Sequence, residues 1–171
     1  MHIVADNSQQ SLVDGRFEMP KFGYSIFGLD PDKTAKASGR ELAVSPKAAR
    51  EVCNVINGMR LSEAKKFLED VIKKKKPVPY FRYKKEIPHR RGLDGWCSGK
   101  YPVKAAQEIL RVLAGVEANA ETKDLDVEKL RVIHAAAQRA RKIKKFIPRA
   151  FGKSSPDFEK LTHVEIVVLE D

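Results

Sequence analysis

Lysine, arginine and aromatic residues interleave in the segment RARKIKKFIPRAFGK, residues 139–153. Seven of its fifteen residues are basic, none is acidic, and Phe146 and Phe151 stand among the charges. Basic side chains bind phosphates, and aromatic rings stack on unpaired bases. The combination therefore indicates a segment that binds nucleic acid. The alternative is a charged loop that is merely solvated. That alternative gives no role to the flat aromatic residues and the rigid proline of the segment.

A second basic block covers residues 73–104 and has the same make-up. It holds eleven basic and two acidic residues, with Tyr80, Phe81, Tyr83 and Trp96 among them. The two blocks carry net charges of +7 and +9, whereas the whole chain carries +10, so the other 124 residues are mildly acidic. A surface that served solubility alone would mix the signs. The concentration of positive charge predicts a polyanionic partner.

Patterns typical of enzymes and metal sites do not occur in the sequence. Its cysteines and histidines show neither the Cys-x-x-Cys nor the His-x3-His spacing of zinc sites. A phosphate loop of the GxxxxGK[ST] type is missing, and Cys97 has no base near it in the sequence. The acidic residues on predicted helices fit a solvated face better than an acid–base pair. The sequence predicts a protein that is not an enzyme and uses no cofactor or metal.

The sequence also bears on location. It has no run of about 18 apolar residues that would predict a membrane span, and its N-terminus lacks the pattern of a signal peptide. The two cysteines, Cys53 and Cys97, are far apart and fit a reducing compartment. We therefore expect a cytoplasmic protein without a membrane partner. Cys53 lies on the apolar face of a predicted helix, where we expect it to be buried.

Three amphipathic helices are predicted to position the basic blocks. Ser45 and Pro46 form a typical helix start, and Gly58 can take the left-handed conformation that ends the first helix. Ser62 is expected to cap the second helix, and apolar residues recur at helical spacing in all three. The predicted helices cover residues 46–57, 62–73 and 102–120.

Two segments rich in β-branched residues, 130–138 and 162–170, predict antiparallel strands. The first basic segment lies between them, so the strands become a hairpin whose arms reach roughly 40 Å at about 3.3 Å per residue. Pro148 and Pro156 are expected to break the ladder, because proline lacks a donor for it. The far end around Gly152 should then be an irregular loop.

These elements predict an α+β fold in which three helices pack on a small antiparallel sheet, with a long basic β-hairpin extension. Residues 1–40 are expected to form an irregular peripheral arm. A lone two-stranded hairpin is marginal in water, and one that carries +7 also repels itself. Phosphates can neutralise such an arm and bases can stack on its rings, so RNA is the expected partner.

Several stretches of the sequence resemble one family of ribosomal proteins. They are SPKAAREVCNVINGMRLSEAKKFLEDV, GKYPVKAAQEILRVLAGVEANAE, KKFIPRAFGK and THVEIVVLED. In these stretches the chain is similar to a family of proteins of the large ribosomal subunit, which is numbered twenty-two in bacteria and seventeen in eukaryotes. The insertion RYKKEIPHRRGLDGWCSGKYP resembles the archaeal and eukaryotic branch. The PRA-x-G stretch near the hairpin tip and ANAE after the third helix are the most specific parts.

The resemblance covers residues 24–171 and implies a single RNA-binding ribosomal domain near the polypeptide exit. This domain would include the basic insertion 73–104 and the extended hairpin 138–162. The hairpin is expected to bridge several segments of large-subunit rRNA and to line the nascent-chain tunnel with its tip. Residues 1–23 form an extension of unknown role, and Met19 is an alternative start.

The resemblance also implies the residues that make contact. The expected RNA contacts are the basic residues Lys73, Lys74, Lys75, Lys76, Arg82, Lys84, Lys85, Arg90, Arg91, Lys100, Arg139, Arg141, Lys142, Lys144, Lys145, Arg149 and Lys153. The expected tunnel tip is Arg149, Ala150, Phe151, Gly152 and Lys153. Phe151 departs from the family, whose members often carry a basic residue there. The implied partners are large-subunit rRNA, neighbouring large-subunit ribosomal proteins and the nascent polypeptide, and not a second copy of the chain.

Two other functions stay open on the sequence alone. The predicted helices 46–57 and 62–73, with a short link that contains glycine, match a helix-turn-helix regulator that binds DNA. The basic charge, however, lies beyond the second helix and not on its exposed face. A stand-alone RNA chaperone, free of ribosomal subunits, is the other alternative.

Overall fold

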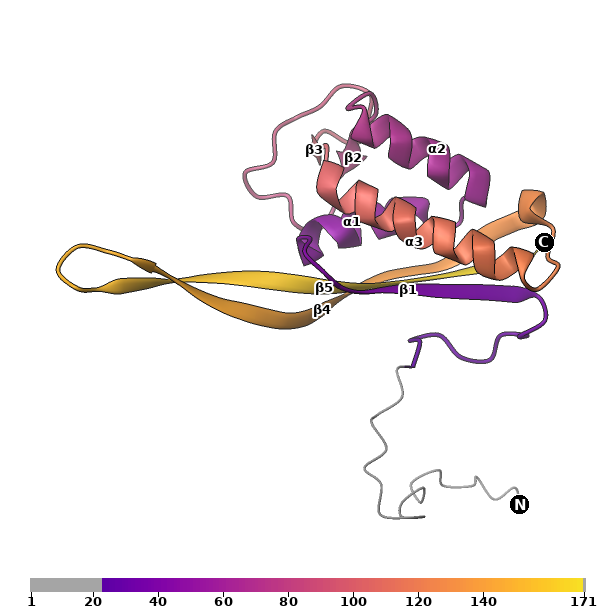
Figure 1. The fold of residues 1–171 in the computed structure, drawn as a ribbon. Coiled ribbons are helices and arrows are strands. Elements are labelled where there is room, and N and C mark those ends of the chain that lie inside the picture. Colours follow the sequence, from indigo (N-terminus) through magenta and orange to yellow (C-terminus); the bar gives the residue numbers. More distant parts are fainter. Residues whose placement is uncertain (1–22, 171) are drawn as a thin grey trace, which may run out of the picture.

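Three helices cover one face of a three-stranded antiparallel sheet (Figure 1). The computed structural model describes residues 23–170, so Met19 and nearly all of the predicted N-terminal extension lie outside the described residues. The elements are β1 (Thr34–Leu42), α1 (Pro46–Ile56), α2 (Leu61–Ile72), β2 (Val78–Pro79), β3 (Gly99–Lys100), α3 (Val103–Glu121), a 3-10 turn (Val127–Lys129), β4 (Leu130–Pro148) and β5 (Ser154–Glu170). Strands β2 and β3 pair with each other as a small second ladder. The arrangement confirms the predicted α+β fold.

Strand β5 is the centre of the sheet, whose order is β1–β5–β4. Its alternate residues Val164, Ile166 and Val168 are fully buried in the core. Each such side chain contributes about 1.5–3 kcal/mol by leaving water. The large helical residues packed in the same core include Val52, Ile56, Leu68, Ile109, Leu113 and Val116. The two-residue period of β5 and the helical apolar stripes are thus confirmed as core.

Strand β1 occupies part of the segment that we expected to be an irregular arm. It pairs with β5 from Thr34 opposite Leu169 to Leu42 opposite Thr162. Gly39 lies so close to α3 that a Cβ atom there would be 2.8 Å from Cγ2 of Val112. The prediction was wrong because TAKASGREL has no alternation of large apolar residues. Small residues suit this strand, since they let the helix approach the sheet.

The helix ends differ from the predictions in detail. Helix α2 begins at Leu61 with Arg60 in the capping position, so Ser62 is not its cap. Leu61 is fully buried and belongs in the first turn, which shifts the start by one residue. Ser45 precedes α1 as predicted, but its side chain makes no capping hydrogen bond. Gly58 adopts the predicted left-handed conformation, with a φ of 89°.

The hairpin leaves the helices beyond Thr162 and continues as a two-stranded ribbon (Figure 1). Its ladder includes the pairs Phe146–Pro156 and Pro148–Ser154, so the prolines do not interrupt it. The predicted irregular loop is therefore wrong, and only the five residues 149–153 connect the strands. Each strand of a two-stranded ribbon has a free edge, where the missing N–H of proline costs no ladder bond.

Two bulges in β4 shape the base of the hairpin. One lies between Val132 and His134, and the other between Arg139 and Lys142. A bulge adds an unpaired residue and increases the local twist of the ribbon. The second bulge stands where the hairpin leaves the sheet, so it helps to set the direction in which the basic arm projects.

Candidate nucleic-acid interface

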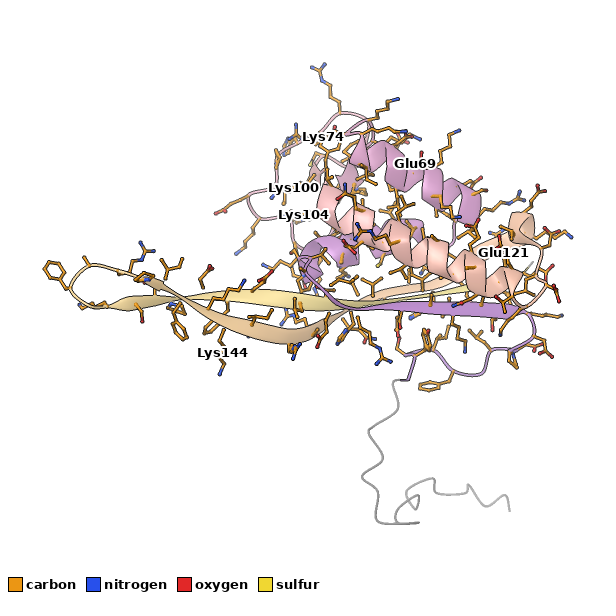
Figure 2. All side chains as sticks on the ribbon, viewed as in Figure 1. Glu69, Lys74, Lys100, Lys104, Glu121 and Lys144 are labelled. Atoms are coloured by element: carbon orange, nitrogen blue, oxygen red, sulfur yellow. The ribbon has the colours of Figure 1, made fainter. Side chains whose placement is uncertain are left out.

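All seventeen basic residues that were predicted to contact RNA are exposed. Figure 2 labels Lys144 on the hairpin and Lys74, Lys100 and Lys104 at the end of the helical layer that lies toward the hairpin tip. Glu121 lies at the opposite end of α3 from Lys104. The two basic blocks, which are separate in the sequence, therefore lie toward the same end of the fold, the end from which the hairpin projects.

The register of the hairpin gives it two unlike faces. Residues directly opposite each other in an antiparallel ladder share a face. On one face, here called the basic-aromatic face, the paired residues are Lys142, Lys144, Phe146, Pro156, Phe158 and Lys160. None of these six residues is acidic. Phe158 and Lys160 continue the alternating series of Val164 and Ile166 along β5, so at the root of the hairpin this face is continuous with the core side of the sheet. Farther out the ribbon twists, and Lys144 points away from the helices (Figure 2).

The opposite face of the ribbon is close to neutral. It carries Ile143, Lys145 and Ile147 across from Glu159, Asp157 and Ser155. The Nζ atom of Lys145 lies 2.5 Å from Oε2 of Glu159. This hydrogen bond lowers the pKa of the Glu159 carboxyl and raises the pKa of the Lys145 ammonium. Lys145 thus already has a carboxylate partner within the hairpin.

Two aromatic rings are displayed on the basic-aromatic face. Phe146 and Phe158 form an edge-to-face pair with ring centroids 6.0 Å apart and an interplanar angle of 89°. Phe146 is 60% exposed and Phe158 is 42% exposed, although both rings are apolar. The edge-to-face arrangement is a favourable geometry for aromatic pairs. It holds the rings beside the lysines, where they can stack on bases.

Residues 149–153 close the far end of the ribbon. The Arg149 N–H donates to the Lys153 carbonyl at 2.8 Å, and the Lys153 N–H donates to the Ala150 carbonyl at 3.3 Å. Phe151 and Gly152 have φ values of 57° and 66°. A left-handed conformation is costly for a bulky residue such as phenylalanine. The loop nevertheless projects the Phe151 side chain outward, with 97% of it exposed.

The basic insertion 73–104 is anchored by aromatic contacts. The Trp96 indole N–H donates to the Tyr80 carbonyl at 3.1 Å. The rings of Phe81 and Trp96 have centroids 5.0 Å apart, and the Lys84 ammonium lies 5.3 Å from the centre of the Trp96 ring. These contacts order an irregular segment while its lysines and arginines stay at the surface.

A buried carboxylate on α1 also holds the insertion. Glu51 is fully buried, forms a 2.8 Å ion pair with Arg50 and accepts a hydrogen bond from the Phe81 N–H at 3.1 Å. A buried charge requires partners of this kind. The sequence offered no signal for this role, because Glu51 resembles any other acidic residue on a helix.

Residues 37–169 match the family model described as ribosomal protein L22p/L17e. The chain belongs to this family. It is 50% identical over 157 residues to the large ribosomal subunit protein uL22 of Ignicoccus hospitalis, an alignment that covers 89% of this chain and 99% of the relative. It is 51% identical to uL22 of Methanosphaera stadtmanae, with 86% and 96% covered, and 48% identical to uL22 of Archaeoglobus fulgidus, with 87% and 96% covered. These archaeal relatives confirm the resemblance to the archaeal branch.

Two basic residues of this L22p/L17e chain lie beside the predicted RNA contacts but were not predicted from the sequence. Lys47 lies in the first turn of α1, between the two basic blocks in space but outside both in sequence. Lys160 stands directly opposite Lys142 in the hairpin ladder. Its neighbour in the chain is Glu159, so a count of charge along the sequence hides it. Only the strand register reveals that Lys160 belongs to the basic-aromatic face.

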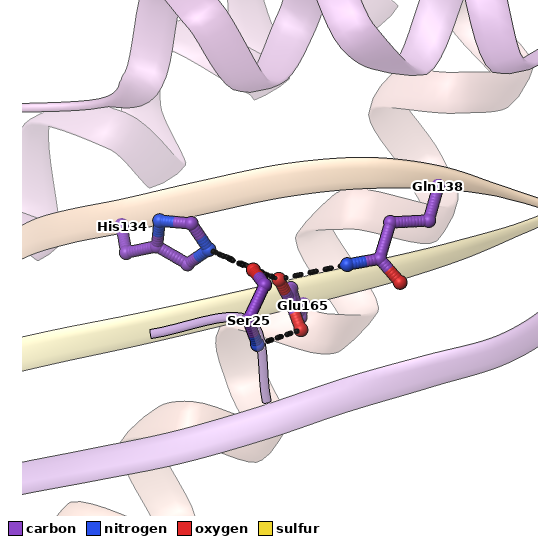
Figure 3. A network of polar contacts seen from close by, with 4 residues as sticks. All are labelled: Ser25, His134, Gln138 and Glu165. Carbon is purple, nitrogen blue, oxygen red and sulfur yellow. Dashed lines mark hydrogen bonds and ion pairs between the residues drawn. The ribbon is translucent and has the colours of Figure 1, made fainter. Parts of the chain in front are cut away.

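A second buried carboxylate ties the N-terminal segment of the L22p/L17e fold to the sheet (Figure 3). Glu165 is 2% exposed and accepts hydrogen bonds from the Ser25 N–H at 3.2 Å, the Ser25 hydroxyl and the Gln138 amide at 3.0 Å. It also lies 3.0 Å from Nε2 of His134. Burial alone would raise the pKa of Glu165, but the hydrogen bonds from Ser25 and His134 lower it below its ordinary value of 4.5.

Other kinds of site find little support in residues 23–170. Within this range, no three histidine, cysteine or acidic side chains are grouped so that they could hold a metal ion. None of the helices described is long and apolar enough to cross a membrane. Cys53 is buried as predicted, and desolvation raises the pKa of its thiol to about 12. That thiol is therefore a packing group of α1.

Proposed function

We propose that this chain is a structural protein of the large ribosomal subunit in the cytoplasm, that it binds large-subunit rRNA and that it catalyses no reaction. Membership of the L22p/L17e family and its relatives named large ribosomal subunit protein uL22 support this role. The observation that carries RNA binding is the basic-aromatic face of the hairpin. There Lys142, Lys144 and Lys160 surround Phe146 and Phe158 without an acidic residue among them.

The proposed role of the hairpin is to hold separate rRNA segments together. Phosphates would neutralise the lysines and arginines of the ribbon, and bases would stack on its exposed rings. The insertion 73–104 would bind a second RNA segment toward the same end of the fold. The domain 24–171 would thus act as one RNA-binding unit that bridges rRNA during subunit assembly, beside neighbouring ribosomal proteins.

The proposed role of the tip is to line the nascent polypeptide exit tunnel. The loop 149–153 lies at the end of the ribbon farthest from the core (Figure 1). Its Phe151 side chain is almost fully exposed, is apolar and projects outward at a backbone cost. Such a residue suits contact with a passing polypeptide better than contact with phosphate.

The helix-turn-helix alternative has less support. The outward residues of α2 include Glu63, Lys66 and Glu69, which are exposed and of mixed sign. A helix that enters the major groove of DNA makes many phosphate and base contacts. The positive charge instead lies on the hairpin and the insertion, which favours an RNA partner that can surround a projecting arm.

Sedimentation of cell extracts tests the proposed function. The native chain should sediment with large ribosomal subunits and should be released by ribonuclease but not by deoxyribonuclease. A chain that remains at the top of the gradient, free of subunits, would support the RNA chaperone instead. Release by deoxyribonuclease alone would support the DNA-binding regulator.

A further inference from the structure

Two hollows adjoin each other at the beginning of α1. The larger has a volume of about 550 Å³, within the usual range of ligand sites, and the smaller has a volume of about 280 Å³. Both are bordered by Ser45 and Lys47, so they meet at this turn. One opens toward the basic insertion and the other toward the root of the hairpin.

The larger hollow combines aromatic rings with cations. Tyr80, Tyr83 and Tyr101 line it together with five basic residues, and no acidic residue does so. Tyr83 is the most closely surrounded ring, because the Lys47 ammonium lies 5.3 Å and the Arg82 guanidinium 5.9 Å from its centre. These cations favour negative charge near the ring. The hollow therefore offers a flat stacking surface inside a positive environment.

The smaller hollow is a cluster of four cations. Lys47, Arg139, Lys142 and Lys160 line it, again without an acidic residue. Lys142 and Lys160 face each other directly across the ladder, and like charges in that position destabilise a hairpin. An anion between them would relieve the repulsion. Ser45 borders the same hollow, and its side chain makes no capping hydrogen bond to α1.

The chemistry of the two hollows together identifies their ligand. A phosphate accounts for the four cations, and an aromatic base accounts for the tyrosines, so the pair fits a nucleotide. An acidic peptide would satisfy the cations but would leave the tyrosines without a partner. The bases of an RNA duplex are stacked inside it, whereas unpaired bases can be splayed out onto protein rings. The nucleotide must therefore be unpaired.

We propose that one unpaired nucleotide of the bound RNA occupies both hollows, with its base against Tyr83 and Tyr101 and its phosphate on Lys47, Arg139, Lys142 and Lys160. This inference rests on the proposed RNA-binding function and adds a defined site to it. The site joins the two basic blocks into one path for a single RNA strand. Lys47, which borders both hollows, is the residue that links them.

Ultraviolet crosslinking of intact large subunits tests the site without any substitution. Subunits are irradiated and digested with ribonuclease and protease, and peptides that carry a nucleotide adduct are located by mass spectrometry. We expect an adduct on Tyr83 or Tyr101. Adducts on the hairpin alone would overturn the nucleotide site and leave the proposed function intact. If the chain is absent from the subunits, the proposed function itself fails.

Binding of hexauridylate to the isolated full chain provides the second test. Replacing Tyr83 by Ala should weaken binding roughly tenfold or more, as expected for the loss of one stacked base, while Tyr83→Phe should retain it. Phe27→Ala is the matched control, because Phe27 is an exposed ring outside both hollows. Tyr83 packs partly against the core, so Tyr101→Ala is measured in parallel.

Three results of the binding experiment would overturn the proposal. The first is unchanged affinity for hexauridylate in both the Tyr83→Ala and Tyr101→Ala chains. The second is a duplex RNA that binds as tightly as the single strand and with the same dependence on Tyr83. The third is a polyglutamate peptide that competes as well as hexauridylate, which would identify an acidic protein segment as the ligand.

Discussion

At the scale of single residues, Lys144 and Lys145 are adjacent in sequence but differ in their surroundings. Lys144 lies opposite Phe158 on the basic-aromatic face, whereas Lys145 forms an ion pair with Glu159 on the other face. A cation that already has a carboxylate partner releases fewer counterions when it meets a phosphate. The two lysines should therefore contribute unequally to RNA binding.

The salt dependence of rRNA binding measures this difference. For Lys144→Gln we expect the log–log slope of affinity against salt to fall in magnitude by about 0.7–0.9, the value for one phosphate contact. For Lys145→Gln the change should be smaller. Binding of the purified chain to large-subunit rRNA over a series of salt concentrations gives both slopes. Equal changes in the two variants would contradict the division of the hairpin into two faces.

Glu165 carries a buried charge that several hydrogen bonds stabilise. Replacing it by Gln should destabilise the protein by about 1–3 kcal/mol near pH 7, because charged hydrogen bonds to Ser25, His134 and Gln138 are lost. Urea unfolding of the free chain measures the difference. Glu159→Gln is the matched control, and it should change stability little because that ion pair is exposed.

The same comparison has a defined pH dependence. The native pKa of Glu165 lies below its ordinary value of 4.5, so its ionised form is favoured by folding. Stabilisation by this group is present above that ordinary value and is lost as the pH falls through the native pKa. The stability of the wild-type chain should therefore approach that of Glu165→Gln in acid. A difference that persists undiminished at pH 3 would contradict this assignment.

At the scale of elements, the hairpin changes character along its length. Between Thr162 and Leu169 strand β5 has β1 on one side and β4 on the other. Farther out, the ribbon has two strands and residues 141–154 are all exposed. Two strands without a packed face are marginal in water. The inner hairpin, which pairs within the three-stranded sheet, therefore belongs to the folded core. The outer hairpin, which has only two strands, depends on bound RNA for its order.

Hydrogen exchange separates these two parts. In the free chain, amides of residues 139–157 should exchange fast, and amides of α1, α2 and α3 should be protected. In assembled large subunits the same hairpin amides should become protected. Slow exchange across the outer hairpin in the free chain would mean that the ribbon is stable by itself, and RNA would then not be needed to order it.

At the scale of the whole molecule, the fold projects the loop 149–153 away from the core and leaves the stem between them (Figure 1). Phosphate contacts are numerous and individually weak, so anchoring should reside in the stem and the insertion. The tip makes no contribution to the hydrophobic core. Anchoring and tunnel lining should therefore be separable.

Replacing residues 149–153 by Asn-Gly tests that separation. Ser154 and Ser155 are kept, because they pair with Pro148 and Ile147 in the ladder, and Asn-Gly favours a two-residue hairpin turn. Subunits should still assemble, but a nascent chain that carries a photo-crosslinker should no longer attach to this protein. A crosslink at full yield would refute tunnel lining by the tip. Failure of assembly would make the tip an RNA anchor.

The sequence by itself determined the helices, the strands 130–138 and 162–170, the basic character of the hairpin and the family. These features are local, since a helical stripe, a two-residue alternation or a run of lysines is visible within one segment. The exposure of the seventeen predicted contacts follows for the same reason, because charged side chains stay in water unless they are paired.

Only the tertiary structure decided that residues 34–42 form a strand and that Lys144 and Lys145 lie on opposite faces of the hairpin. It also decided that Lys47 and Lys160 lie in the same cluster of cations as Arg139. Strand β1 exists through its pairing with β5, which no local pattern of small residues announces. The hairpin faces depend on register, and a slip of one residue would exchange them. The two hollows at α1 arise where three segments distant in sequence meet, so their positive charge is a property of the fold.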